Sequence, residues 1–245
     1  MDKTAIIIPS RLDAIRLPNK PLELINNKEM ILHVYEAAKK TNIGDVYVAT
    51  PDQKIIDVIT NNGGNAFLTA LDHQTGTDRV YEVFRNKLKS EPDIIINLQG
   101  DMPNIDPKAI ASLVSHMKKK ECDIATLASS FSSEAELADE NNVKVVVEKK
   151  LEVNNFGKAT DFLRTITNTH KNFYHHVGIY AFTNKALVRY VSLERSKLEL
   201  ERNLEQLRAL ENNMSIHVGY INSSPLSVDT KNDLIEVKKI MKNNE

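Results

Sequence analysis

An apolar, β-branched run near the N-terminus constrains the fold of this chain more than any other feature of its sequence. Residues 5–8 read Ala-Ile-Ile-Ile, and the run stops at Pro9, where a loop begins. A continuous run of this kind is typical of a parallel strand buried on both faces of a sheet. Because strand and helix patterns then alternate with short connections, the sequence predicts an α/β fold with a mainly parallel, doubly wound sheet.

Length and composition exclude several classes of protein. The chain has 245 residues and a formal net charge of −1, which provides no basic field to attract nucleic acid or an anionic membrane surface. The sequence shows neither a signal-peptide pattern nor an apolar run of the roughly 20 residues that span a bilayer. The single cysteine, Cys122, excludes an intrachain disulfide and the usual zinc arrangements. We therefore expect a cytoplasmic protein with no nucleic-acid partner and no membrane partner.

Residues 1–245 are expected to form one domain, because we find no linker, repeat or low-complexity segment. The first half, about 1–126, has the regular alternation, whereas the second half, about 127–245, has a middle part that resembles an insertion. Segment 154–172 is polar and fits no element clearly. Strands are expected at 5–8, 45–49, 66–68, 93–98, 123–127, 143–147, 177–182 and 216–221, and helices at 31–39, 50–59, 77–88 and 198–210, from 106 onward and from 231 onward.

Three cations follow the first predicted strand. Arg11, Arg16 and Lys20 lie in one loop, and Asp13 is the one acid among them. In open α/β sheets ligands bind beyond the carboxyl ends of the strands, so these side chains suit a polyanion such as a nucleoside triphosphate. The alternative is a solvated loop without a specific ligand. Three cations after an N-terminal strand favour the phosphate interpretation.

Two aspartates are candidates for a metal site. Asp101 follows the apolar strand at 93–98, and Asp229 follows another predicted strand end. Mg²⁺ prefers one or two carboxylates together with phosphate oxygens. Each aspartate alone is equally well explained as a helix or turn cap. The pair, combined with the basic loop, favours the metal interpretation.

The loop 73–79, His-Gln-Thr-Gly-Thr-Asp-Arg, opens a predicted helix. Backbone N–H groups at a helix N-terminus bind phosphate, ribose or a base edge, although an ordinary loop capped by Thr75 or Thr77 explains the pattern equally well. Neighbouring residues of a strand point to opposite faces, so His175 and His176 do not form a zinc site. A single strand histidine is more often structural than a ligand, and a solvated face is the default interpretation of Glu205 and Gln206.

Taken together, these segments resemble the 3-deoxy-manno-octulosonate (Kdo) cytidylyltransferase family of sugar-activating cytidylyltransferases. The resemblance covers nearly the whole chain, and the order and approximate spacing of the motifs match throughout. The matching segments are 8–11, 16–22, 72–79, 97–101, 143–146, 176–180, 204–208 and 227–230.

The resemblance implies a Rossmann-like nucleotidyltransferase fold, a homodimer formed largely through the middle segment, and dependence on Mg²⁺. Members of the family join CTP and Kdo to give CMP-Kdo and pyrophosphate, for lipopolysaccharide core biosynthesis. The first half would bind the nucleotide, and the second half would bind the sugar and form the dimer. By position the catalytic residues would be Arg11, Arg16, Lys20 and Asp101; the nucleotide-binding residues Arg11, Arg16, Lys20, His73, Thr75, Gly76, Thr77 and Arg79; the metal ligands Asp101 and Asp229; and the sugar-binding residues Gln99, Lys158, Arg164, His176, Tyr180, Glu205 and Gln206.

The chain departs from the family pattern at two places. Met102 stands where a glutamate is common, a change that we expect to be tolerated. Segment 155–159, Asn-Phe-Gly-Lys-Ala, replaces a Tyr-Phe-Ser-Arg-Ala motif whose arginine faces the sugar. Lysine replaces the charge but not the bidentate fork, so either Lys158 serves, or Arg164 takes over, or the sugar differs. The alternatives are an 8-amino Kdo relative, a sialic-acid-type substrate, or a non-catalytic relative that binds nucleotide.

Overall fold

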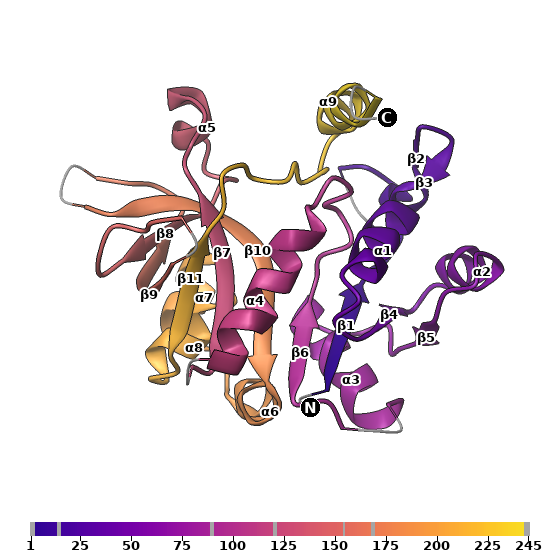
Figure 1. The fold of residues 1–245 in the computed structure, drawn as a ribbon, viewed down its shortest axis with the longest axis horizontal. Coiled ribbons are helices and arrows are strands. Elements are labelled where there is room, and N and C mark those ends of the chain that lie inside the picture. Colours follow the sequence, from indigo (N-terminus) through magenta and orange to yellow (C-terminus); the bar gives the residue numbers. More distant parts are fainter. Residues whose placement is uncertain are drawn as a thin grey trace. The chain divides into compact units, whose positions relative to one another are not determined.

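The computed structural model describes residues 3–13, 16–88, 91–119, 122–153, 155–167 and 170–242 (Figure 1). The chain forms two compact units, Met1–Ala111 with Pro225–Glu245, and Ser112–Ser224. The C-terminal segment therefore belongs to the first unit, whereas the division expected from the sequence placed it in the second half.

The first unit contains a sheet with the strand order β5-β4-β1-β6, and the described pairs of this sheet are parallel. All six residues of β1 are buried, as the apolar run at its centre requires. The strands of this sheet are β1 (Thr4–Pro9), β4 (Asp45–Thr50), β5 (Ala66–Leu68) and β6 (Ile94–Asn97).

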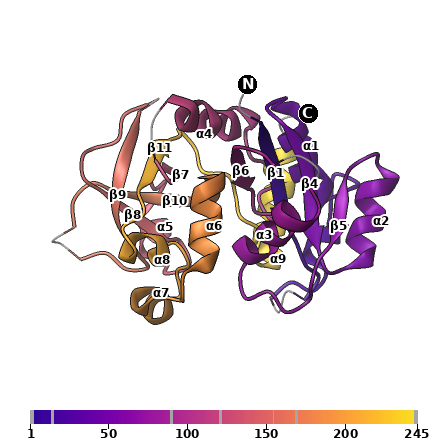
Figure 2. The same ribbon diagram turned by 90° about the horizontal axis from the view of Figure 1, so that it is seen from below.

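Helices connect these strands, and each has one apolar face. Helix α1 packs on β4, and α3 contacts β1, β4 and β6 (Figure 2). The buried positions of α3, such as Val80, Val83 and Phe84, recur at helical spacing, which the sequence predicted. The connecting helices are α1 (Met30–Lys40), α2 (Gln53–Asn61) and α3 (Gly76–Asn86), and the chain passes into the second unit within α4 (Pro107–Lys119).

The C-terminal helix of the first unit packs near the loop that follows β1. Val228 and Leu234 form a buried cluster with Leu17 from that loop and with Ile25 and Met30. This cluster attaches the end of the chain to a segment more than 200 residues earlier in the sequence. The elements involved are the short helix η1 (Lys20–Leu22), the hairpin β2 (Leu24–Ile25) and β3 (Lys28–Glu29), and α9 (Lys231–Lys242).

The second unit is mostly antiparallel. Its strand order is β10-β7-β11-β9-β8, and β10 also pairs with β8. Only the pair of β11 with β7 is parallel among its described strands. The strands are β7 (Ile124–Ser129), β8 (Lys144–Val147), β9 (Phe156–Leu163), β10 (Phe173–Thr183) and β11 (Ile216–Tyr220), and the helices are α5 (Glu134–Ala138), α6 (Asn184–Ser192), α7 (Lys197–Arg202) and α8 (Leu207–Glu211).

The mainly parallel sheet expected for the chain does not extend to this unit, where most described strand pairs are antiparallel. Two further expectations for this unit differ from the structure. The polar segment that fitted no element contains β9, whose eight residues alternate between buried and more exposed positions only in part. The single helix expected at 198–210 is wrong, because the chain forms α7 and α8 with a break at Asn203. Asn203 has a φ of 52°, and asparagine adopts this left-handed conformation more readily than most residues, so it ends α7. Both Leu204 and Leu207 are still buried, so the apolar pattern does not reveal the break.

None of the helices within the described part of the chain combines the length and apolarity needed to cross a membrane.

Candidate active site

The loop that follows β1 carries its cations next to acidic side chains. Arg11 Nε lies 3.0 Å from Asp13 Oδ1, and both side chains are exposed. A guanidinium nitrogen of Arg16 lies 3.0 Å from Asp229 Oδ2. Asn19, with a left-handed φ of 56°, turns the chain so that Lys20 begins the short helix η1. Exposed pairs of this kind contribute little to stability, so these arginines are available to an anionic ligand at small cost.

Lys20 lies between the two candidate metal ligands. Its Nζ is 2.9 Å from Asp101 Oδ2 and 3.0 Å from Asp229 Oδ1, and only 15% of its side chain is exposed. Burial by itself lowers the pKa of the Lys20 amine, but the two carboxylates outweigh burial and hold the pKa above its usual value. Lys20 is therefore a fixed positive charge at neutral pH.

Backbone contacts explain why two aspartates so distant in sequence meet. The N–H of Val228 donates to the carbonyl of Asp101 at 2.9 Å, which joins the segment after β6 to the segment before α9. Val228 is completely buried in the same cluster as Leu17, so apolar packing holds both segments against the basic loop. Asp233 accepts hydrogen bonds from the N–H groups of Asp229 and Thr230 and fixes the turn that carries Asp229.

The two carboxylates suit a hard divalent cation. Asp101 and Asp229 both contact one ammonium nitrogen, so their oxygens already converge on a small volume. Carboxylate oxygens are the ligands that Mg²⁺ takes from proteins, with phosphate oxygens and water completing its octahedron. The donor set therefore fits Mg²⁺, and Lys20 together with Arg16 now balances the two carboxylate charges.

The loop before α3 is held in place by two acidic side chains. His73 Nε2 lies 2.5 Å from Glu82 Oε2, and the N–H of Ala70 donates to the same oxygen. Burial alone raises the pKa of Glu82, but these hydrogen bonds lower it, so the carboxylate stays charged. Thr75 and Asp78 form a reciprocal capping box at the start of the helix. The capping interpretation of Thr75 is therefore correct, and it does not exclude contact with a ligand.

A buried polar chain joins this helix to the end of β6. Asn97 Nδ2 donates to Thr77 Oγ1 at 3.1 Å, and Gln99 Nε2 donates to Asn97 Oδ1 at 3.0 Å. Thr77 is buried and fastens α3 to the sheet. Arg79 is also buried, and one of its nitrogens donates to Thr69 Oγ1 and to the carbonyl of Ala70. Desolvation, followed by the charge of Arg11, lowers the pKa of the Arg79 guanidinium from its ordinary value, which leaves it protonated.

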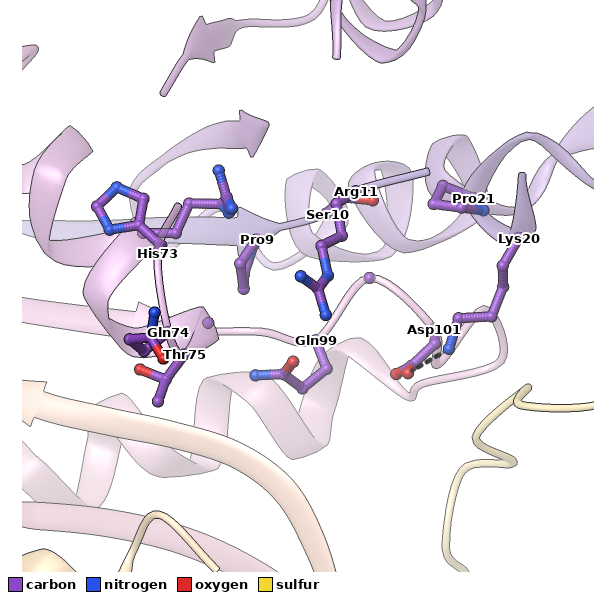
Figure 3. Close-up of a pocket in the computed structure, with 13 residues that line it drawn as sticks. Pro9, Ser10, Arg11, Lys20, Pro21, His73, Gln74, Thr75, Gln99 and Asp101 are labelled. Carbon is purple, nitrogen blue, oxygen red and sulfur yellow. Dashed lines mark hydrogen bonds and ion pairs between the residues drawn. The ribbon is translucent and has the colours of Figure 1, made fainter. Parts of the chain in front are cut away.

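These segments line an open cleft at the carboxyl ends of β1 and β6, with a volume of about 280 Å³ (Figure 3). Lys20 and Asp101 lie at one end of the cleft, His73, Gln74 and Thr75 lie at the other, and Gln99 lies between them. Most residues predicted to bind nucleotide line it, whereas Arg16 and Thr77 do not. The lining residues are Pro9, Ser10, Arg11, Lys20, Pro21, His73, Gln74, Thr75, Gly76, Arg79, Gln99, Gly100 and Asp101.

Several lining residues were not selected from the sequence. Ser10 directly follows β1 and Gly100 lies three residues beyond the end of β6, and position at a strand end was the signal that could have identified them. Space at Gly100 is tight, because a Cβ there would lie 3.3 Å from the carbonyl oxygen of Pro9 and 3.1 Å from Ile31 Cδ1. Gln74 lies in the loop 73–79, but a glutamine at this position predicted no specific contact.

Two of the predicted sugar-binding residues lie on or next to β9 in the second unit. Lys158 is half-exposed, and its Nζ lies 3.5 Å from Glu148 Oε1. The Arg164 guanidinium donates to the main-chain carbonyls of Arg202, Asn203 and Glu140, at 3.0 to 3.1 Å. Arg164 therefore anchors the chain around Asn203, and its role toward a sugar stays a prediction.

The other predicted sugar-binding residues of the second unit are mostly buried. His176, Tyr180 and Gln206 are each less than 9% exposed. The imidazole of His176 contacts Thr126 Oγ1 at 2.9 Å, and that hydroxyl donates to the carbonyl of Ile179. Because the hydroxyl has one proton, Nε2 of His176 is the donor to Thr126. The carbonyl of Glu205 accepts a hydrogen bond from the hydroxyl of Tyr190.

Burial of His176 predicts a dependence of stability on pH. Desolvation, and then the charge of His175, lower the pKa of His176 to about 3 from an ordinary 6.5. A depressed folded pKa stabilises the protein above the unfolded pKa, and this stabilisation is lost as the pH falls from about 6.5 toward 3. Between pH 7 and pH 5 the native protein should lose about 2 kcal/mol more unfolding free energy than His176→Gln, which does not titrate there.

Urea unfolding followed by circular dichroism at both pH values measures this difference. The fold of the variant is checked at pH 7, where the histidine is neutral in both states. Equal losses for the two proteins would mean that His176 is protonated in the folded state at pH 5.

A cleft at the ends of parallel strands, with cations on one wall and converging carboxylates beside them, is typical of nucleotide-binding α/β proteins. The chain as a whole is an α/β protein with a nucleotidyltransferase-like fold. The family model described as cytidylyltransferase matches residues 5–216.

Relatives of known name match over almost the whole chain. The 3-deoxy-manno-octulosonate cytidylyltransferase of Bartonella henselae is 42% identical and that of Paramagnetospirillum magneticum 39% identical, with 96% and 97% of this chain covered and 97% of each relative. The solved structure of CMP:2-keto-3-deoxy-manno-octonic acid synthetase complexed with CTP is 36% identical, with a TM-score of 0.90, and covers 99% of this chain and 100% of its own. The chain belongs to the 3-deoxy-manno-octulosonate cytidylyltransferase family.

Proposed function

We propose that this chain transfers the cytidylyl group of CTP to Kdo and releases pyrophosphate, which yields CMP-Kdo for lipopolysaccharide core biosynthesis. The observation that carries the proposal is that Lys20 and Asp101, which line the strand-end cleft, meet Asp229 beside it. Full-length similarity to a synthetase solved with CTP, at a TM-score of 0.90, supports the identity of the nucleotide and the sugar.

The cations of the basic loop bind the triphosphate in this proposal. Lys20 is a preformed, half-buried charge, so it stabilises developing charge on pyrophosphate without reorganisation at the moment of reaction. Arg11 and Arg16 lie nearer the solvent, and each exchanges a weak exposed ion pair for a charge-assisted hydrogen bond to a phosphate. Thr75 and Gly76 present the N-terminus of α3 to the nucleotide, while His73 and Arg79 support this loop.

Asp101 and Asp229 hold Mg²⁺ in this proposal. When bound, Mg²⁺ neutralises triphosphate charge that otherwise repels an acidic sugar. The residues of the cleft act chiefly by positioning, so that an anomeric hydroxyl of the sugar attacks the α-phosphorus in line and pyrophosphate leaves. Each aspartate also keeps Lys20 protonated, which couples the metal ligands to the residue that contacts the leaving group.

The remaining expectations belong to the same proposal. In this proposal Gln99, which lines the cleft, contacts the sugar. The other residues proposed to bind the sugar are Lys158, Arg164, His176, Tyr180, Glu205 and Gln206. The family resemblance supports a homodimer formed through the middle segment, and the single, buried cysteine supports a cytoplasmic location.

Pyrophosphate release with CTP and Mg²⁺ tests the function. The sugars are Kdo, its 8-amino relative and N-acetylneuraminate, with reactions lacking sugar as the blank and UTP as the nucleotide control. Release with Kdo, together with a product of the mass of CMP-Kdo, is expected. Release with another acidic sugar alone would keep the reaction class and change the substrate, as the lysine at position 158 allows. Binding of CTP without release for any sugar would support the non-catalytic alternative.

A further inference from the structure

Three side chains with metal-binding atoms meet in the second unit. His116 of α4, Cys122 just before β7, and His217 of β11 each place one ligand atom within 4.8 Å of the other two. Cys122 is buried and the two histidines are half-buried. None of the three lines the cleft described above.

Backbone pairing fixes Cys122 beside His217. The N–H of Asp123 donates to Ser215 Oγ at 2.9 Å, and the N–H of Ser215 donates back to Asp123 Oδ2 at 2.8 Å. These reciprocal bonds lock the start of β7 to the start of β11, and the two strands then continue in parallel register. The distance between Cys122 and His217 is therefore set by the sheet and not by a flexible loop.

His116 is fixed from the opposite side by an aromatic ring. The imidazole of His116 stacks on Phe156 with ring centres 3.8 Å apart and an angle of 6° between the planes. Phe156 lies directly against Gly219, where a Cβ would come within 2.5 Å of the ring. Because Gly219 and His217 are two residues apart on β11, they share a face, and the stacked ring directs His116 toward His217.

The two imidazoles already approach as ligands of one ion would. His116 Nε2 and His217 Nδ1 are 2.9 Å apart. Two nitrogens bound to one tetrahedral Zn²⁺ at 2.0–2.1 Å lie about 3.3 Å apart, so a metal needs only a small outward movement. Met117 adds a thioether, whose Sδ lies 3.3 Å from Cys122 Sγ. Nitrogen, thiolate and thioether ligands select soft or borderline transition metals and do not suit Mg²⁺.

We propose that His116, Cys122 and His217 form a binding site for a thiophilic d¹⁰ metal ion, Zn²⁺ or Cu⁺. The ion joins α4, β7 and β11, and Met117 is the fourth ligand available to Cu⁺ but not to Zn²⁺. Sequence spacing gave no sign of the site, because its ligands come from residues 116, 122 and 217 and form no short motif. Burial raises the pKa of the Cys122 thiol to about 11, so in the metal-free protein it is no reactive nucleophile.

Cobalt is the first probe, because a thiolate ligand gives Co²⁺ a charge-transfer absorption in the near ultraviolet. Any Co²⁺ bound by the carboxylates of the first unit would not produce this absorption, because they provide no thiolate ligand. The full chain, titrated with Co²⁺ at neutral pH, should develop the band to one equivalent, and one equivalent of Zn²⁺ should remove it. No such band, or a band that Cys122→Ser retains, would overturn the proposal.

Zinc affinity measured by competition with a chelating dye tests the thiolate and one of the two histidines. We expect Cys122→Ser and His217→Gln each to weaken Zn²⁺ binding by at least about 100-fold. His170→Gln removes a histidine of the same unit outside the cluster, so its affinity should equal that of the native chain. Circular dichroism checks that each variant is folded, and His217→Gln keeps the test valid if the buried Cys122→Ser fails to fold. Native affinity in a folded His217→Gln variant would contradict the site.

The thioether separates the two candidate ions. Cu⁺, delivered under anaerobic reducing conditions, should bind more weakly to Met117→Leu than to the native chain, whereas Zn²⁺ affinity should be the same for both. Weakening for Cu⁺ alone identifies a copper-type coordination. If Met117→Leu binds each ion as tightly as the native chain does, the coordination is of a three-residue zinc type. Either result supports the site. Failure of both ions to bind the native chain would reject it.

Discussion

Asp101→Asn is expected to reduce the rate of pyrophosphate release from CTP by about 10³-fold. The change keeps the shape of the side chain but removes a charge that holds Mg²⁺ in the proposed function, and such charge stabilisation is worth several kcal/mol in a transition state. It also removes one of the two carboxylates that keep Lys20 protonated and in place. Steady-state rates at several Mg²⁺ concentrations measure the effect, and the Mg²⁺ dependence should shift to higher concentration.

Asp106→Asn is the matched control for this substitution. Asp106 lies five residues further along the chain, is exposed, and accepts a hydrogen bond from the N–H of Lys108 at the start of α4. Asparagine supports the same capping bond, so activity should remain close to that of the native chain. Near-native activity in a folded Asp101→Asn protein would show that Asp101 does not hold the metal. A large loss in the control would show that the rate responds to general damage in this region.

Local sequence patterns predicted the first unit well for a physical reason. The strands β1 and β6 are buried along their whole length and mostly apolar, and the helices between them have one apolar face. These patterns depend only on near neighbours in the chain. The alternation of strand and helix therefore identified the strand ends, and with them most residues of the cleft.

The convergence of the charged groups depends on distant contacts instead. Nothing near Asp229 in the sequence shows that apolar packing of Val228 against Leu17 brings it to Lys20. The sequence suggested that the basic loop was almost free of acids, whereas Lys20 is paired with two carboxylates. Pairing of this kind requires the fold, and the sequence provided only the hint that both aspartates follow predicted strand ends, as the basic loop does.

The second unit was predicted less well, because its decisive residues break local patterns. Asn203 ends a helix inside an apolar stripe, and β9 begins in a polar segment. The pattern of apolar residues also does not reveal which charged residues are buried. Nothing in the sequence analysis pointed to an ion pair of Glu199 and Arg208, yet the exposed fraction of Glu199 is 0% and that of Arg208 is 3%.

The buried pair of Glu199 and Arg208 gives the largest expected effect on stability. Arg208 Nε and a terminal nitrogen lie 2.8 and 2.7 Å from the two carboxylate oxygens of Glu199, a bidentate contact. The guanidinium also lies 4.7 Å from the centre of the Tyr190 ring. Burial alone raises the pKa of Glu199, but the bonds from Arg208 and Arg195 outweigh it and keep the carboxylate charged. Arg208→Met should therefore lower the free energy of unfolding by about 3–5 kcal/mol, because a buried carboxylate loses its main partner.

Two further variants separate a lost partner from lost packing. Arg195 contacts the same carboxylate at 3.0 Å, but 42% of its side chain is exposed, so Arg195→Met should cost no more than about 1 kcal/mol. The double variant Glu199→Leu/Arg208→Met removes both buried charges, and it should recover most of the stability lost by Arg208→Met alone. Urea unfolding of all four proteins gives the comparison. If the double variant is as unstable as Arg208→Met, the arginine acts through its packing on Tyr190, and the charge of Glu199 is not the cause.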